Sequence, residues 1–147
     1  MARPLVAEVD LTALKHNLAL AKEQNSHAKT LAVVKANAYG HGSVKVSLAL
    51  DSDADAFGVA SIEEALELRA GGVRAPVLLL EGCFAEEELT SCEYHDFWLV
   101  CHSDYQIEWL LKHLLTTQWR PQVWLKVDSG MHRLGFDTVA VPRVLEQ

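Results

Sequence analysis

Residues 31–43 read Leu-Ala-Val-Val-Lys-Ala-Asn-Ala-Tyr-Gly-His-Gly-Ser, an apolar run that ends in a lysine and then passes into small residues and glycines. The run is continuous rather than alternating, which is typical of a parallel strand covered on both faces. A lysine at the carboxyl end of such a strand stands where α/β folds place their reactive groups. This stretch therefore predicts an α/β protein with a candidate site around Lys35.

Similar apolar runs recur along the chain and predict a series of strands. They are residues 5–9, 31–34, 56–60, 77–80, 97–101 and 123–127. Amphipathic stretches between them predict helices, the first capped by Asp10 and carrying Leu11, Leu14 and Leu18 on one face. Ser61 with Glu64, and Ser103 with Gln106, have the spacing of capping boxes, and Gly71 and Gly72 are expected to end a helix. We therefore expect β-α-β-α units with right-handed crossovers.

Two architectures accommodate this order: a doubly wound parallel sheet, or part of a (β/α)8 barrel. A complete barrel takes about 250 residues, whereas this chain has 147. On length alone the doubly wound sheet is favoured.

Composition excludes several classes of protein. The formal net charge is −7, from 13 basic and 20 acidic residues, which argues against a nucleic-acid partner or an anionic membrane surface. The first ten residues lack the uninterrupted apolar stretch of a signal peptide, and no apolar run is long enough to span a membrane. Cys83, Cys92 and Cys101 are spaced nine residues apart, which fits neither a zinc site nor a disulfide framework, and the histidines lack metal-ligand spacing. We expect a cytoplasmic protein with reduced, largely buried thiols and no metal.

The segment around Lys35 carries reactive chemistry in one interpretation and none in the other. Burial disfavours an ammonium group, so a lysine at this place can act as a Schiff-base nucleophile or a general base. Gly40 and Gly42 allow the backbone to approach a ligand, and Tyr39 adds an aromatic ring with a hydroxyl group. Alternatively, Lys35 is a strand-end lysine that extends to solvent while Tyr39 packs over the rim.

A second segment, residues 125–136, also passes from an apolar run into a polar loop with glycines: Leu-Lys-Val-Asp-Ser-Gly-Met-His-Arg-Leu-Gly-Phe. The planar guanidinium of Arg133 suits a carboxylate, a phenolate or a phosphate, and would face the same site as Lys35. In the alternative interpretation Asp128 and Ser129 are turn formers and Arg133 is a partner in a surface ion pair.

Together the two segments resemble the pyridoxal-phosphate alanine racemases of bacteria. Residues 34–42, Val-Lys-Ala-Asn-Ala-Tyr-Gly-His-Gly, are similar to the cofactor-lysine signature of that family almost letter for letter. Further matches are residues 7–11, 57–60 and 126–135, together with Asn17-Leu18 and Glu63-Glu64-Ala65. They occur in the order of the family and span nearly the whole chain.

The resemblance implies a role for each matching residue. Lys35 would hold pyridoxal 5'-phosphate as an internal aldimine and then act as one of two bases that move the α-proton. Tyr39 would reach the cofactor phosphate, and Arg133 would bind the phenolic oxygen of the cofactor and the carboxylate of the substrate. Lys126 matches a position that is often carbamylated in the family, and a carbamate there would give Arg133 an anionic partner.

The resemblance also implies a fold and a function. The fold is a partial (β/α)8 TIM barrel, with about five of eight barrel strands, preceded by one extra strand over Leu5–Val9. Residues 1–147 would be the N-terminal part of the cofactor-binding barrel domain, without the C-terminal β domain of the family and without the tyrosine that serves as the second base. The activity is interconversion of L-alanine and D-alanine for peptidoglycan or for catabolism, in a homodimer, with this chain expected to be inactive alone. Two alternatives stay open: a non-catalytic module that binds the cofactor, and a stand-alone doubly wound binding domain.

Overall fold

A computed structural model describes residues 5–146, and five parallel strands form its single sheet. The strands are β1 (Leu31–Val33), β2 (Ala56–Val59), β3 (Val77–Leu79), β4 (Trp98–Cys101) and β5 (Val123–Leu125). Their spatial order is the same as their order in the chain, β1-β2-β3-β4-β5, and every neighbouring pair is parallel. A doubly wound sheet reverses its strand order at a switch point. The sequential order therefore contradicts that architecture and is consistent with part of a (β/α)8 barrel.

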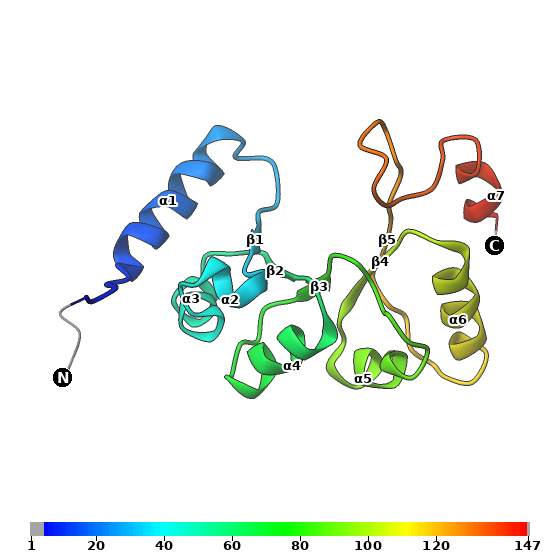
Figure 1. Ribbon diagram of the computed structural model, residues 1–147, viewed down its shortest axis with the longest axis horizontal. Coiled ribbons are helices and arrows are strands. Elements are labelled where there is room, and N and C mark those ends of the chain that lie inside the picture. Colours follow the sequence, from blue (N-terminus) through cyan, green and yellow to red (C-terminus); the bar gives the residue numbers. More distant parts are fainter. Residues whose placement is uncertain (1–4, 147) are drawn as a thin grey trace.

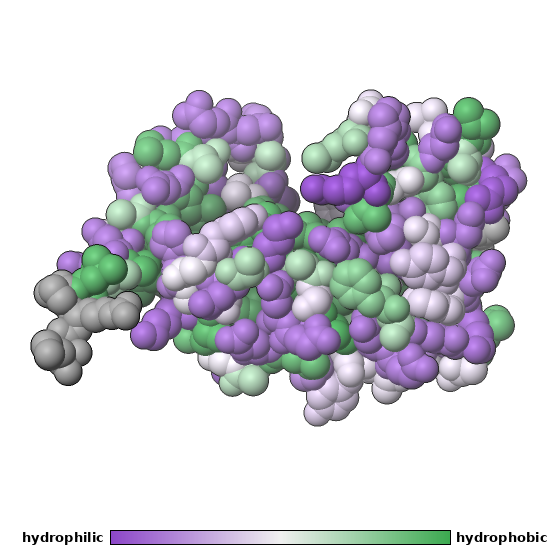
Figure 2. All heavy atoms as spheres, viewed as in Figure 1, coloured by the Kyte–Doolittle hydropathy of each residue, from purple (hydrophilic) through white to green (hydrophobic). Residues whose placement is uncertain are grey.

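Seven helices accompany these strands in the described part of the chain. They are α1 (Leu11–Gln24), α2 (Lys35–Tyr39), α3 (Ser43–Leu50), α4 (Ile62–Ala70), α5 (Glu88–His95), α6 (Asp104–Leu114) and α7 (Val141–Leu145). Figure 1 shows α3, α4, α5 and α6 following one another along the outer side of the row of strands, as the outer helices of a barrel do. In the space-filling view the molecule is hollowed between α1 and the segment that follows β5 (Figure 2). No helix within residues 5–146 combines the length and the apolar character needed to cross a membrane.

Burial of the strands follows their position in the sheet. All residues of β2 and β3 are buried, because these strands have a neighbour on each side and helices on the outer face. The edge strands β1 and β5 contain no buried residue, and Trp124 on β5 is 50% exposed. The core lies between the sheet and the outer helices and includes Phe57, Leu68 and Phe97. The central strands β2 and β3 are thus fully buried, whereas the edge strands β1 and β5 lack a neighbouring strand on one side.

The prediction of an extra strand over Leu5–Val9 is wrong. These residues belong to no strand, and Leu5 and Val6 are 88% and 82% exposed. An apolar run becomes a strand only where a neighbouring strand pairs with its backbone groups, and within residues 5–146 none does so here. The interpretation of the first ten residues as lacking a signal peptide falls partly on residues 1–4, which lie outside the described residues.

Several local expectations are confirmed. Asp10 caps α1, since its carboxylate accepts hydrogen bonds from the backbone amides of Thr12 and Ala13 at 2.8 and 3.1 Å. The helix α4 ends at Gly71, as expected. The three thiols are free and buried, and burial raises the pKa of the Cys101 thiol to about 12. They therefore act as small apolar residues of the core.

Candidate active site at the carboxyl ends of the strands

Lys35 stands two residues after the end of β1, at the edge of the sheet and at the carboxyl ends of its strands. Its neighbours on both sides are hydrogen-bonded to other elements. The amide of Val34 donates to the carbonyl of Gly58 on β2 at 2.9 Å, and the amide of Ala36 donates to Glu64 Oε1 at 2.7 Å. The side chain of Lys35 is half-buried. The backbone of this lysine is therefore fixed relative to β2 and α4.

The short element α2 is not an ordinary helix, because the turn after Lys35 is left-handed. Ala36, Asn37, Ala38 and Tyr39 have φ between 51° and 55°, and Gly40 follows at 90°. Left-handed backbone costs roughly 1–2 kcal/mol for each residue other than glycine, and asparagine tolerates it best. Runs of such residues persist only where the surroundings impose them, and they concentrate at functional sites. The segment that the sequence singles out for its chemistry is thus also a strained segment of the backbone.

Two hydrogen bonds to Asn37 connect this turn to the residues that follow it. Asn37 Oδ1 accepts a hydrogen bond from the amide of Ser43 at 2.9 Å, and the carbonyl of Asn37 accepts from the amide of Gly42 at 3.0 Å. These bonds join the left-handed turn to the start of α3. Tyr39 lies at the end of the turn with 63% of its surface exposed, so its hydroxyl group is open to a ligand.

The second predicted segment forms a loop that closes on itself after β5. Val127 pairs with Phe136, the amide of Phe136 donates to the carbonyl of Lys126, and the amide of Asp128 donates to the carbonyl of Phe136, both at 2.8 Å. Asp128 Oδ1 accepts from the amides of His132 and Gly130 at 3.0 Å, and Asp128 Oδ2 lies 2.9 Å from His132 Nδ1. The hydrogen bonds from the backbone of His132 and of Gly130 lower the pKa of the Asp128 carboxyl to about 2. Asp128 is therefore the turn former that its sequence position indicates.

Lys126 and Arg133 lie on this loop in different environments. Lys126 is half-buried next to β5, and its amide donates to the carbonyl of Cys101 on β4 at 2.9 Å. Arg133 is exposed, and its guanidinium makes no hydrogen bond or ion pair with any residue between 5 and 146. The interpretation of Arg133 as a surface ion-pair partner thus finds no partner in the described chain.

The structure groups the four predicted residues in two pairs. Lys35 and Tyr39 follow β1, whereas Lys126 and Arg133 follow β5, at the opposite edge of the same sheet. All four lie at the carboxyl ends of parallel strands, the end where (β/α)8 barrels carry their active sites. Within residues 5–146, no hydrogen bond or ion pair joins one pair to the other.

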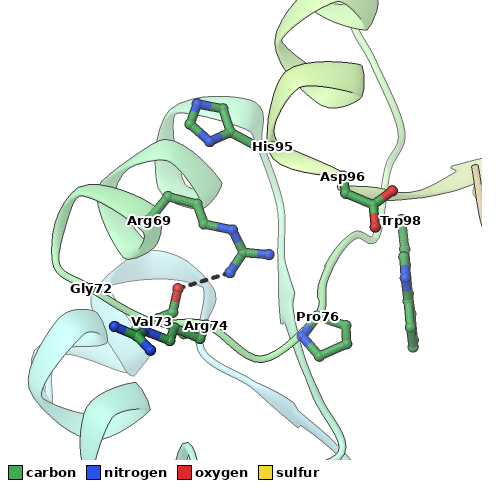
Figure 3. Close-up of a pocket in the computed structure, with 8 residues that line it drawn as sticks. All are labelled: Arg69, Gly72, Val73, Arg74, Pro76, His95, Asp96 and Trp98. Carbon is green, nitrogen blue, oxygen red and sulfur yellow. Dashed lines mark hydrogen bonds between the residues drawn. The ribbon is translucent and has the colours of Figure 1, made fainter. Parts of the chain in front are cut away.

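A cavity of about 480 Å³ lies at the other end of the strands, among residues that precede β3 and β4. Figure 3 shows Arg69 with its guanidinium directed at the carbonyl of Val73, to which it donates at 3.0 Å; it also donates to the carbonyl of Ala75 at 2.8 Å. The same guanidinium lies 5.3 Å from the centre of the Phe97 ring. Arg69 therefore fixes the connection between α4 and β3, and this cavity is separate from the end of the sheet that carries Lys35.

Sequence reasoning missed residues that organise the carboxyl ends of the strands. Neither predicted capping box forms: Glu64 Oε2 accepts from the amide of Ala60 at 2.8 Å, and Gln106 Oε1 accepts from the amide of His102 at 2.9 Å. His102 is buried, with Nε2 3.1 Å from the carbonyl of Glu81. No periodicity distinguishes Glu64 and Gln106 from ordinary first-turn residues, because Glu64 bonds to Ala36 and Gln106 bonds to Glu81 and Cys83, which lie on other segments.

Comparison with known proteins gives one consistent result. A model of the alanine racemase N-terminal domain matches residues 9–147. A catabolic alanine racemase of Pseudomonas putida is 57% identical over 134 residues, which cover 90% of this chain and 36% of that protein. The crystal structure of the biosynthetic alanine racemase of Pseudomonas aeruginosa is 49% identical with a TM-score of 0.90, covering 97% of this chain and 39% of that one.

A further structure, an alanine racemase of Bartonella henselae with covalently bound pyridoxal phosphate, is 28% identical with a TM-score of 0.83 and covers 95% of this chain and 39% of that one. The chain thus spans less than two-fifths of the length of each of these three relatives.

Proposed function

The chain belongs to the alanine racemase family, within its N-terminal domain, and from this membership we propose that it carries the lysine side of a pyridoxal-phosphate site. The observation that supports the proposal best is the placement of Lys35. It lies two residues after β1, at the carboxyl ends of the strands, and the residues on both sides of it are hydrogen-bonded to β2 and α4. A group that must attach a cofactor in one orientation needs such a rigid base.

The side chains at this end of the sheet fit the chemistry of pyridoxal phosphate. The amine of Lys35 suits the aldehyde carbon, the exposed hydroxyl of Tyr39 suits the phosphate, and the unpaired guanidinium of Arg133 suits the phenolic oxygen and the substrate carboxylate. The bound cofactor supplies an electron sink that makes the α-proton of an amino acid removable. The Bartonella henselae relative, solved with covalently bound pyridoxal phosphate, supports this assignment.

Each residue then has a task. Lys35 holds the cofactor and, once released by the substrate, takes or returns the α-proton on one face of the substrate. Arg133 orients the substrate carboxylate, and a carbamylated Lys126 would give Arg133 an anionic neighbour. Racemisation needs a second base on the opposite face. We assign none within this chain, so we propose that the 147-residue chain binds the cofactor and by itself does not racemise alanine.

For the whole protein we propose the interconversion of L-alanine and D-alanine. Relatives named catabolic and biosynthetic both match, so supply of D-alanine for peptidoglycan and catabolism of alanine both stay within the proposal. The homodimer and the cytoplasmic location that the resemblance implies stay predictions.

A spectroscopic titration tests the proposal. Pyridoxal phosphate added to the purified chain should produce a visible absorbance band in wild type and in Lys45→Ala, a control on the exposed face of α3, but not in Lys35→Ala. No band in wild type, or an equal band in Lys35→Ala, would overturn the assignment of the cofactor lysine. A coupled assay for D-alanine formed from L-alanine should detect no turnover by this chain, and turnover that depends on Lys35 would show that it contains both bases.

A further inference from the structure

The carboxylate of Glu64 joins the chain just after Lys35 to the end of a neighbouring strand. Glu64 lies in the first turn of α4. Its Oε1 accepts the amide of Ala36 at 2.7 Å, and its Oε2 accepts the amide of Ala60, the residue after β2, at 2.8 Å. Both oxygens are therefore used, each by a backbone donor from a different strand end. A hydrogen bond to a charged acceptor is roughly twice as strong as a neutral one.

The hydrogen bond from Ala36 to Glu64 lies where the backbone changes from negative to positive φ. Lys35 is the last residue before the left-handed turn, and Ala36 is the first residue with positive φ, at 51°. The remaining backbone bonds of the turn, such as that from the amide of Gly40 to the carbonyl of Asn37 at 3.0 Å, connect residues within or next to it. Contacts inside a turn cannot fix the orientation of the turn relative to the sheet. The bond from Ala36 to Glu64 spans 28 residues and can do so.

The two anchors beside Lys35 together define the direction in which its side chain leaves the backbone. Val34 is held on β2 through the carbonyl of Gly58, and Ala36 is held on α4 through Glu64. When both neighbours of a residue are fixed to the same scaffold, the direction of its Cα–Cβ bond relative to that scaffold is also fixed. Loss of either anchor would leave the strained turn free to relax toward ordinary backbone angles.

We propose that Glu64 is a positioning residue that holds the left-handed turn against β2 and thereby directs Lys35 at the cofactor. The proposal rests on the proposed function only in naming the cofactor; the hold on the turn is a property of the chain without it. A carboxylate is needed because two N–H groups converge on the side chain. A glutamine would offer one acceptor oxygen and would turn its NH2 group, itself a donor, toward the other amide.

The variant Glu64→Gln tests this, with Glu63→Gln as the matched control. Glu63 is the preceding residue of α4, is exposed, and makes no hydrogen bond to residues 34–42 in the described structure. Amide hydrogen exchange is measured by NMR without cofactor. The concentration of pyridoxal phosphate that gives half of the visible absorbance change is measured separately. Thermal unfolding of each variant is followed by circular dichroism.

In Glu64→Gln we expect exchange at Ala36 or Ala60 to accelerate about tenfold or more, as loss of a charge-assisted hydrogen bond implies. We expect the half-saturating concentration of pyridoxal phosphate to rise by about the same factor, at an unfolding temperature close to that of wild type. Glu63→Gln should change neither quantity. A role limited to folding would instead lower the unfolding temperature and spread faster exchange along the whole of α4.

Several results would overturn the proposal. Unchanged exchange at both Ala36 and Ala60 would remove the bridge, and unchanged cofactor binding despite faster exchange would remove its positioning role. If wild type shows no absorbance band, the proposed function fails, and the exchange measurement still decides whether Glu64 holds the turn. If Glu64→Gln does not fold, Glu64→Asp keeps the charge on a shorter side chain, and the same comparison with wild type decides.

Discussion

The loops that follow the two edge strands carry the predicted site residues and are stabilised in different ways. The loop after β1 has local bonds from Asn37 but is fixed to the sheet by residues distant in sequence, through the bonds from Val34 to Gly58 and from Ala36 to Glu64. The loop after β5 is held by its own residues, with Asp128 bonded to Gly130 and His132, and Phe136 bonded back to Lys126. One loop has a left-handed backbone over four successive non-glycine residues, whereas in the other positive φ falls on Gly130, His132 and Gly135, with no two of them adjacent.

The difference indicates which part of the site is rigid. Distant partners can impose a conformation that the local residues disfavour, whereas a loop held by its own residues must use residues that suit it. The lysine therefore stands on a backbone set by the fold, and Arg133 stands on a loop that forms from its own turn chemistry.

The largest loss of folding stability is expected from substitution of Gly135. A Cβ built there would lie 2.7 Å from the backbone nitrogen of Asp128, and the φ of Gly135 is 120°. Gly135→Ala should therefore cost about 3 kcal/mol, from strain and overlap together, measured by urea unfolding. Gly130→Ala is the control, since φ there is 145° but no atom lies within 4 Å of the added carbon. Equal costs for the two variants would refute the close backbone contact that closes the loop after β5.

A smaller change in the free energy of unfolding is expected at Ala36, where substitution by glycine should stabilise the chain. Glycine adopts positive φ without penalty, so Ala36→Gly should stabilise the chain by about 0.5–1 kcal/mol. Ala19, exposed within α1, is the control, and Ala19→Gly should destabilise by about 1 kcal/mol, as glycine does in an ordinary right-handed helix. Denaturant unfolding of both variants measures the difference. Destabilisation by both variants alike would contradict a left-handed turn after Lys35.

The smallest effect is expected from acid, which should weaken only the hydrogen bonds to Asp128 in the loop after β5. The folded pKa of Asp128 is about 2, below the ordinary value of 3.8, because the carboxylate accepts amides of His132 and Gly130. A depressed pKa means that these bonds stabilise the loop fully above about pH 4 and are lost as the pH falls through about 2. NMR of the Asp128 carboxyl carbon should give a midpoint near 2. In Asp128→Ala, which removes the acceptor oxygen, exchange at Gly130 and His132 should be faster than in wild type. A midpoint near 3.8 in wild type would contradict the bonds.

The same contrast explains how much of the structure could be predicted from sequence. Asp128 and Ser129 are good turn formers, so the loop after β5 could be anticipated, and five of the six predicted strands are confirmed. The strand over Leu5–Val9 is wrong, because an apolar run does not show whether a neighbouring strand exists. The hand of residues 36–39 could not be predicted, because alanine and tyrosine there disfavour it and the residues that impose it lie elsewhere. Glu64 has the spacing of a capping box, and only the fold shows that it binds Ala36.

The most direct test of the account is where pyridoxal phosphate attaches to this chain. The cofactor is added at less than one equivalent, the product is reduced with borohydride, and the labelled peptides are quantified by mass spectrometry. We expect the label to be concentrated on Lys35, with little on Lys126, which lies at the same end of the sheet. Label spread evenly over the lysines, or concentrated on Lys126, would contradict the claim that the fold prepares Lys35 as the cofactor lysine.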